Sequence, residues 1–212
     1  MNMNWSRLIF AVIFFVSIAF FLRNLFRLFA MLCLGRWENH FDRLTDRLVS
    51  MLWYAFGQLR VVRSRFGYNH LLIFWGFMVL LLLNFEFLVA GLFPRFSLSF
   101  IGHTPYGVLL VLTEVMSVLV LAAVGAAAVR RIFFRPDYIE ASLDAFLILG
   151  AIAVLMAAYF GFHAGEIRLG TTDYAAWMPV SRLAAGLYAT LSPRGAEVVT
   201  GAFWWIHALV LL

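Results

Sequence analysis

Long apolar runs separated by short polar connections dominate the pattern of this chain. A membrane with a hydrocarbon core of about 30 Å needs roughly 20 apolar residues in each helix that crosses it. Lipid offers the backbone no hydrogen bonds, so each such run is expected to be helical. Five runs are seen, at residues 5–34, 69–92, 105–130, 141–163 and 201–212. The pattern predicts an all-α fold, an integral membrane five-helix bundle that forms one domain over residues 1–212.

The stretch 36–66, between the first two runs, follows a different pattern. Its apolar residues recur at helical spacing, and charged residues such as Asp42, Arg43 and Arg47 lie between them. This pattern is typical of an amphipathic helix that lies on the membrane surface rather than crossing it. Residues 164–196, with several Gly, Pro and Thr, are expected to be a connection. The last run would stop in mid-bilayer, so we expect the polypeptide to continue beyond residue 212.

The composition also favours a membrane protein. Hydrophobic residues make up 64% of the chain and charged residues 13%, with a mean hydropathy of +0.92. Soluble domains average roughly 45–50% apolar and about 25% charged residues. The 16 basic residues are all Arg and cluster at the ends of the runs, which is expected of a membrane protein and argues against a nucleic-acid-binding protein. The single Cys33 excludes an internal disulfide and a Cys-ligated iron–sulfur cluster built from these residues.

The distribution of Arg predicts the orientation. The 36–66 connection holds six Arg residues and the next one on the same side, about 131–140, holds Arg130, Arg131 and Arg135, whereas the connection between the second and third runs holds only Arg95. The first two are therefore expected to face the cytoplasm, with the amino terminus outside. We expect both connections to dock a soluble partner, because dense positive charge steers an acidic protein. The first twenty residues resemble a signal peptide, but the apolar run continues without a small-residue cleavage site, which favours a retained helix. Arg23 and Arg27 are expected to reach the interface or to bind an anionic group.

Two histidines are candidates for binding a cofactor, because a His inside a lipid-spanning helix is costly and usually functional. His70 lies one step into the second run, at the predicted cytoplasmic side. His207 follows the pair Trp204–Trp205, which marks the outer interface. Imidazole nitrogens are common axial ligands of haem iron. The alternative for each residue is an interfacial His with a structural role.

His70 and His207 lie near opposite membrane faces, so each needs its own partner. His163 ends the fourth run on the outer side, level with His207, and is the best internal partner; the alternative is a solvated His in a loop. The partner of His70 is expected beyond the residues given. His103 is interpreted as a loop residue and His40 as a solvated residue of the 36–66 stretch.

Two carboxylates are predicted inside the bilayer, Glu86 in the outer half of the second run and Glu114 in the outer half of the third. An intramembrane carboxylate usually marks a proton or ligand path. The alternative is a structural carboxylate that pairs with Arg95 or accepts a hydrogen bond from a helix. Glu140 and Asp144 begin the fourth run, where the helix dipole alone explains them.

Four stretches of the sequence resemble one known family in their order and spacing. They are FGQ (56–58), GYNHLLIFWGF (67–77), RRIFFRP (130–136) and FWWIH (203–207). The resemblance is to the membrane domain of haem-b iron–sulfur oxidoreductases, the HdrD-like proteins that include membrane-bound ETF:quinone oxidoreductases. The same domain is similar to the gamma subunit of respiratory nitrate reductase. The resemblance covers the second to the fifth run.

This resemblance implies two b-type haems stacked across the inner (plasma) membrane of a bacterium or archaeon, a quinone site and a cytoplasmic iron–sulfur module. His70 matches the inner haem ligand and His207 the outer one. The nitrate reductase subunit carries a further His along its second helix, at the position where this chain has Leu80. The outer haem must therefore use another ligand, for which His163 is the candidate, or be absent.

The predicted function is electron transfer by a haem-b membrane subunit between a cytoplasmic iron–sulfur module and membrane quinone, with electron-transfer flavoprotein as one candidate partner. Haem b, in one or two copies, is the expected cofactor. Glu86 or Glu114 is expected to take up the proton that quinone chemistry releases. One alternative is a cofactor-free membrane anchor for a soluble enzyme, which leaves His70 and His207 unexplained. Another is a transporter subunit, although neither broken helices nor an inverted repeat is seen.

Overall fold

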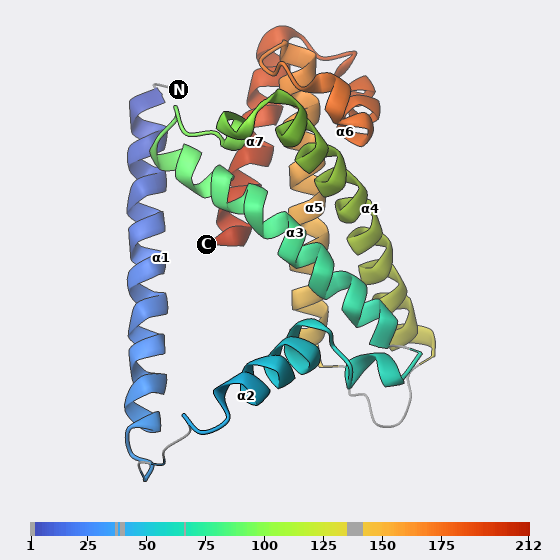
Figure 1. Ribbon diagram of the computed structural model, residues 1–212. Coiled ribbons are helices and arrows are strands. Elements are labelled where there is room, and N and C mark those ends of the chain that lie inside the picture. The colour runs from blue at the N-terminus through green and yellow to red at the C-terminus, as the bar shows by residue number, and fades with distance from the viewer. Residues whose placement is uncertain (1–2, 37, 39–40, 66, 135–141) are drawn as a thin grey trace. The chain divides into compact units, whose positions relative to one another are not determined.

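A computed structural model describes residues 3–36, 38, 41–65, 67–134 and 142–212 (Figure 1). Within these ranges the chain forms helices and helical turns and no strand, which confirms the predicted all-α class. The α-helices are α1 (Met3–Leu32), α2 (Leu44–Met51), α3 (Gly67–Leu92), α4 (His103–Phe133), α5 (Leu143–Leu169), α6 (Pro179–Ala184) and α7 (Pro193–Leu211).

Four helices of the described chain, α1, α3, α4 and α5, are long and apolar enough to cross a membrane. Many of their large apolar side chains are exposed, as expected where lipid replaces water at the surface. The predicted fifth span is not confirmed, because α7 is not among these four and carries Arg194 and Glu197 in its first turns.

Contacts within the chain separate it into two compact units, Met1–Leu71 with Leu212, and Leu72–Leu211. The first contains α1 and the predicted amphipathic stretch. In that stretch the described residues form α2, a π-helical turn (Leu52–Phe56) and a 3₁₀ turn (Val61–Arg63), so the helical part is shorter than the 36–66 expected. Arg23 and Arg27 lie on α1 with exposed side chains, and His40 lies outside the described residues.

The second unit differs from the sequence prediction at two helix ends. α5 continues past residue 163 to Leu169, where Gly170 takes a left-handed conformation with φ of 68° and ends the helix. α7 begins at Pro193, eight residues before the predicted 201, and the hydroxyl of Ser192 accepts a hydrogen bond from the N–H of Gly195. Pro at the first helical position with Ser before it is a helix-start signal that the apolar pattern alone did not reveal.

A pair of glycines lets α5 and α7 pack closely. Gly161 and Gly165 lie four residues apart on α5, and a Cβ added at either would collide with Phe203 or Thr200 of α7. This is the small-xxx-small pattern by which membrane helices approach each other. A glycine can loosen a helix, but α5 is unbroken at Gly161, and this glycine serves interhelical packing.

We predict that Gly161→Ala or Gly165→Ala lowers the free energy of unfolding by about 1–3 kcal/mol, the usual cost of overpacking. The matched control is Gly150→Ala, on the same helix, whose added Cβ would meet no atom within 4 Å. This control should be neutral or slightly stabilising, since Ala is the better helix former. Thermal unfolding of the detergent-solubilised protein measures the difference. Equal melting temperatures for all three variants would contradict close packing at this interface.

Candidate functional site

A cavity of about 430 Å³ lies in the second unit, among α3, α4, α5, α7 and the segment after α5. Its wall is apolar and partly aromatic, formed by Leu83, Phe87, Leu110, Phe162 and Met178. Its polar lining comprises Asn84, Glu86, Ser97, Tyr106, Tyr159, His163, Glu166, Thr171, Thr172, Asp173, Tyr174 and His207. A cavity of this size, in which an apolar wall meets convergent polar groups, is typical of a small-molecule site.

His207 lies at the buried side of this cavity, with 3% of its surface exposed. Its Nε2 lies 3.2 Å from Oδ1 of Asn84 on α3, and its ring lies 4.5 Å from that of Phe87. Asn84 therefore stands opposite His207, one helical turn beyond Leu80. Leu80 instead packs in an apolar cluster with Val120 and neighbouring residues of α4 and α5.

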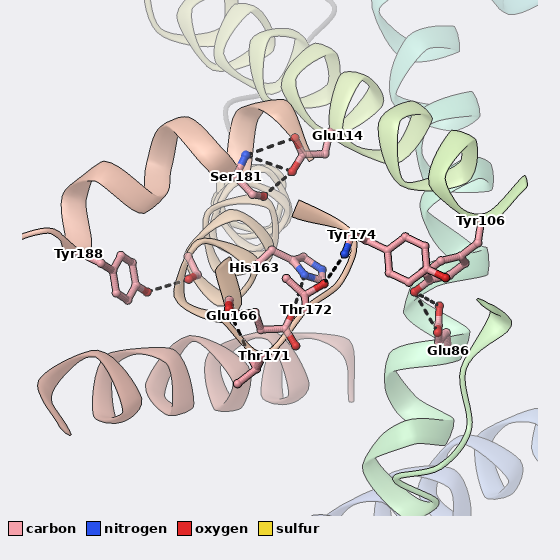
Figure 2. A network of polar contacts seen from close by, with 11 residues as sticks. Glu86, Tyr106, Glu114, His163, Glu166, Thr171, Thr172, Tyr174, Ser181 and Tyr188 are labelled. Atoms are coloured by element: carbon pink, nitrogen blue, oxygen red, sulfur yellow. Dashed lines mark hydrogen bonds and ion pairs between the residues drawn. The ribbon is translucent and has the colours of Figure 1, made fainter. Parts of the chain in front are cut away.

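His163 lies within α5, so the alternative of a loop histidine is wrong. Its Nδ1 is 2.7 Å from Oε2 of Glu166, one turn further along the helix (Figure 2). The two predicted partners His163 and His207 thus line the same cavity. Sequence reasoning missed Glu166, although its His-x-x-Glu spacing puts the two side chains on one helix face.

Tyr159 lies one turn before His163 and is 5% exposed. Its ring centroid is 4.6 Å from that of His163 and 6.5 Å from that of His207. Its hydroxyl is buried and makes no hydrogen bond to any residue that the structure describes. Nothing in the sequence pattern distinguishes Tyr159 from a packing residue.

Glu86 lines the cavity but is already bound to an outer connection. Its carboxylate accepts hydrogen bonds from Ser97 Oγ at 2.7 Å and from the N–H of Leu98 at 2.9 Å. It also accepts one from Tyr106 Oη at 3.0 Å (Figure 2). These donors, and not Arg95, hold it in place. The carboxylate therefore fixes the 97–98 turn against α3 and α4.

Glu114 lies outside the cavity lining and is fully buried. It accepts a hydrogen bond from the N–H of Val180 at 2.5 Å. It also accepts hydrogen bonds from the N–H of Ser181 at 3.1 Å and from the hydroxyl of Ser181 (Figure 2). These donors lie at the start of α6, where helix N–H groups lack partners and favour negative charge. The contacts favour the structural alternative for Glu114, a carboxylate that anchors α6.

The other candidate histidines lie elsewhere. His70 is in the first turn of α3, has an exposed side chain and belongs to the first unit. His103 begins α4 and stacks on Tyr174 at 5.0 Å. Among the described residues no three His, Cys, Asp or Glu side chains gather as a metal site. Haem needs only axial ligands from the protein, so the lack of such a cluster does not argue against haem. What matters for haem is whether the imidazoles can act as axial ligands.

The imidazoles fit the outer haem only in part. The pairing of His163 with Glu166 resembles the carboxylate–imidazole pairs seen behind metal ligands. The Nε2 of His207, however, is bonded to Asn84, whose amide does not take the place of a second imidazole. The donor set therefore does not complete a bis-imidazole site, and His163 and His207 as outer haem ligands stay a prediction.

Two curated proteins are similar to the chain. One is the EtfAB:quinone oxidoreductase of Syntrophomonas wolfei, 27% identical over 224 aligned residues that cover 99% of this chain and 30% of that protein. The other is the probable iron–sulfur-binding oxidoreductase FadF of Bacillus subtilis, 28% identical over 185 residues, 86% of this chain and 26% of that protein. The chain thus spans less than a third of either relative. No family model and no solved structure matches it.

We predict that Glu114→Ala destabilises the protein by about 3 kcal/mol or more, because it leaves several buried donors unpaired. Limited proteolysis should then cut within residues 170–192 at lower protease concentrations than in the wild type. Glu197→Ala, at an exposed position of α7, is the control and should behave as the wild type. If Glu114→Ala keeps its melting temperature and protease resistance, the carboxylate does not anchor α6.

Proposed function

We propose that the chain is the membrane part of an oxidoreductase and passes electrons between an iron–sulfur module and membrane quinone. The observation that carries this proposal is the similarity to two oxidoreductases, one named for quinone and EtfAB and the other for iron–sulfur binding. The four candidate membrane spans support it, since a lipid-soluble quinone is reached from within a membrane. The iron–sulfur module would lie on another chain or on a further segment, with electron-transfer flavoprotein as a candidate donor.

Haem b is the proposed cofactor of this path, and His70 is its proposed inner ligand. The imidazole of His70 is exposed at the first turn of α3, so a ligand can reach it. Its counterpart would come from beyond the described residues. Bound haem would supply one-electron transfer, while the protein supplies position and a dry surrounding. With the amino terminus outside, His70 lies on the cytoplasmic side, close to the proposed partner.

The proton chemistry of quinone is assigned to the outer side of the second unit. Glu86 remains the proposed proton acceptor of the two intramembrane acids, because it lines the cavity while Glu114 does not. Glu86 is held by three donors, so its uptake of a proton would have to loosen the 97–98 turn. Glu114 is assigned the anchoring of α6.

The Arg-rich stretch 36–66 is the proposed docking surface for the soluble partner. The second predicted docking stretch, 131–140, falls mostly on residues 135–141, which lie outside the described residues. Arg43 and Arg47 of the first stretch make ion pairs with Asp42, and both Arg side chains are exposed. Arg23 and Arg27, exposed on α1, are proposed to bind an anionic group of the lipid or cofactor.

The purified protein should show the absorption change of b-type haem between its reduced and oxidised forms. We predict that His70→Ala removes the inner haem, while His103→Ala, the control at an exposed loop-side position, keeps it. Haem and protein contents measured together give the stoichiometry, one or two per chain. A His70→Ala protein with unchanged spectrum and stoichiometry would remove His70 as a ligand, and a wild type without haem would favour a cofactor-free anchor.

Docking through Arg should weaken with salt, because exposed charges are screened over about 8 Å at physiological ionic strength. We expect the affinity for the acidic redox partner to fall between low and high salt, and to fall at low salt when Arg60, Arg63 and Arg65 are replaced by Gln. Replacing Arg168, Arg182 and Arg194, on the opposite connection, is the control. Cross-links of the partner found only on residues 164–196 would contradict this docking surface.

A further inference from the structure

We propose that the cavity of the second unit binds the headgroup of a quinone, and that the hydroxyl of Tyr159 donates a hydrogen bond to one of its carbonyl oxygens. This inference rests on the proposed function for the choice of substrate class. It adds the place of binding and a residue that touches the substrate. It also assigns a quinone to this cavity in place of the second, outer haem.

The unpartnered hydroxyl of Tyr159 is the first observation. A buried hydroxyl without a partner costs free energy, and Phe would pack the same ring without that cost. Tyr188 shows the usual solution in this protein: it is equally buried, and its hydroxyl donates to the carbonyl of Gly161 at 2.7 Å. Tyr159 is a lining residue of the cavity and its buried hydroxyl has no partner among the described residues, so we infer that its partner is an acceptor atom on a ligand bound there.

The chemistry of the rest of the cavity matches a flat ring with carbonyl groups. Leu83, Phe87 and Phe162 supply apolar and aromatic surface. Asn84 uses its amide oxygen toward His207, which leaves its NH₂ group as a second donor at the cavity. A quinone headgroup offers acceptors only, so a site lined by such donors suits it.

The same contacts argue against a second haem in this place. Opposite His207 stands an amide, and the Nε2 of His207 is already bonded to its oxygen atom. His163 uses its Nδ1 toward Glu166, and the other nitrogen of His207, Nδ1, is buried with no partner among the described residues. A site with two axial imidazoles would need Asn84 to move and His163 to turn toward the same iron. A hydrogen-bonded organic ring needs neither change.

The test uses the whole protein in nanodiscs of a zwitterionic lipid. The probe is decylubiquinone, a short-tailed quinone, and binding is followed by quenching of Trp fluorescence, since Trp204 lies 5.3 Å from the cavity residue Phe87. We expect Tyr159→Phe to bind the probe about five- to tenfold more weakly, as for the loss of one hydrogen bond. Tyr188→Phe, the matched control outside the cavity, should bind as the wild type.

Melting temperatures separate a binding role from a structural one. Tyr188→Phe should lower the melting temperature because it removes a hydrogen bond, whereas Tyr159→Phe should leave it unchanged or raise it. Wild-type affinity in Tyr159→Phe overturns the proposal. Quenching of equal strength by decylbenzene also overturns it, because the effect would then be apolar partitioning only.

Haem content, measured on the same samples, distinguishes this inference from the proposed function. Quinone binding that depends on Tyr159 in a protein without haem would keep the site and remove the haem-linked path. Haem without quinone binding would remove the site alone. Two haems per chain, one of them lost in His207→Ala, would make the cavity a haem site and overturn the inference.

Discussion

The arrangement of the second unit depends on satisfying two buried carboxylates inside a bundle whose long helices are apolar enough to cross a membrane. A buried charge without donors is very unfavourable, so Glu86 and Glu114 must find hydrogen bonds within the protein. The donors come from the outer connections: the 97–98 turn and Tyr106 bind Glu86, and the start of α6 binds Glu114. Glu86 of α3 thereby fixes the turn that follows its own helix, and Glu114 of α4 fixes the segment that follows α5.

This anchoring shapes the cavity. With α6 held by Glu114, Met178 is buried against Leu83 and Leu110, and Tyr174 packs on Tyr106 at 4.8 Å. These residues form part of the outer wall of the cavity. The two carboxylates therefore shape the cavity by holding the residues that form this wall. Of the two, only Glu86 also lines the cavity. A proton path in this unit would have to use carboxylates that also hold these connections in place.

Which side chains of neighbouring helices face each other decides the chemistry that the cavity can support. The resemblance placed Leu80 opposite His207, but the structure places Asn84 there, one turn along α3. An amide opposite an imidazole favours a hydrogen-bonded ligand over an axially bound metal. His163 and Glu166 add a second imidazole and a carboxylate to the same wall, and Tyr159 adds a hydroxyl with no other partner.

The sequence by itself determined the helices, because lipid leaves the backbone no other way to form its hydrogen bonds and apolar runs mark where lipid lies. It also identified His70, His163, His207, Glu86 and Glu114 as costly polar residues in apolar surroundings. It could not tell which of them meet, since periodicity assigns residues to a helix face but does not say which face turns toward which neighbour. Only the tertiary structure decided that Asn84 faces His207, 123 residues away, and that Glu114 binds Ser181, 67 residues away. The first contact joins α3 to α7 and the second joins α4 to α6, so each is a property of packing between helices and not of any one run.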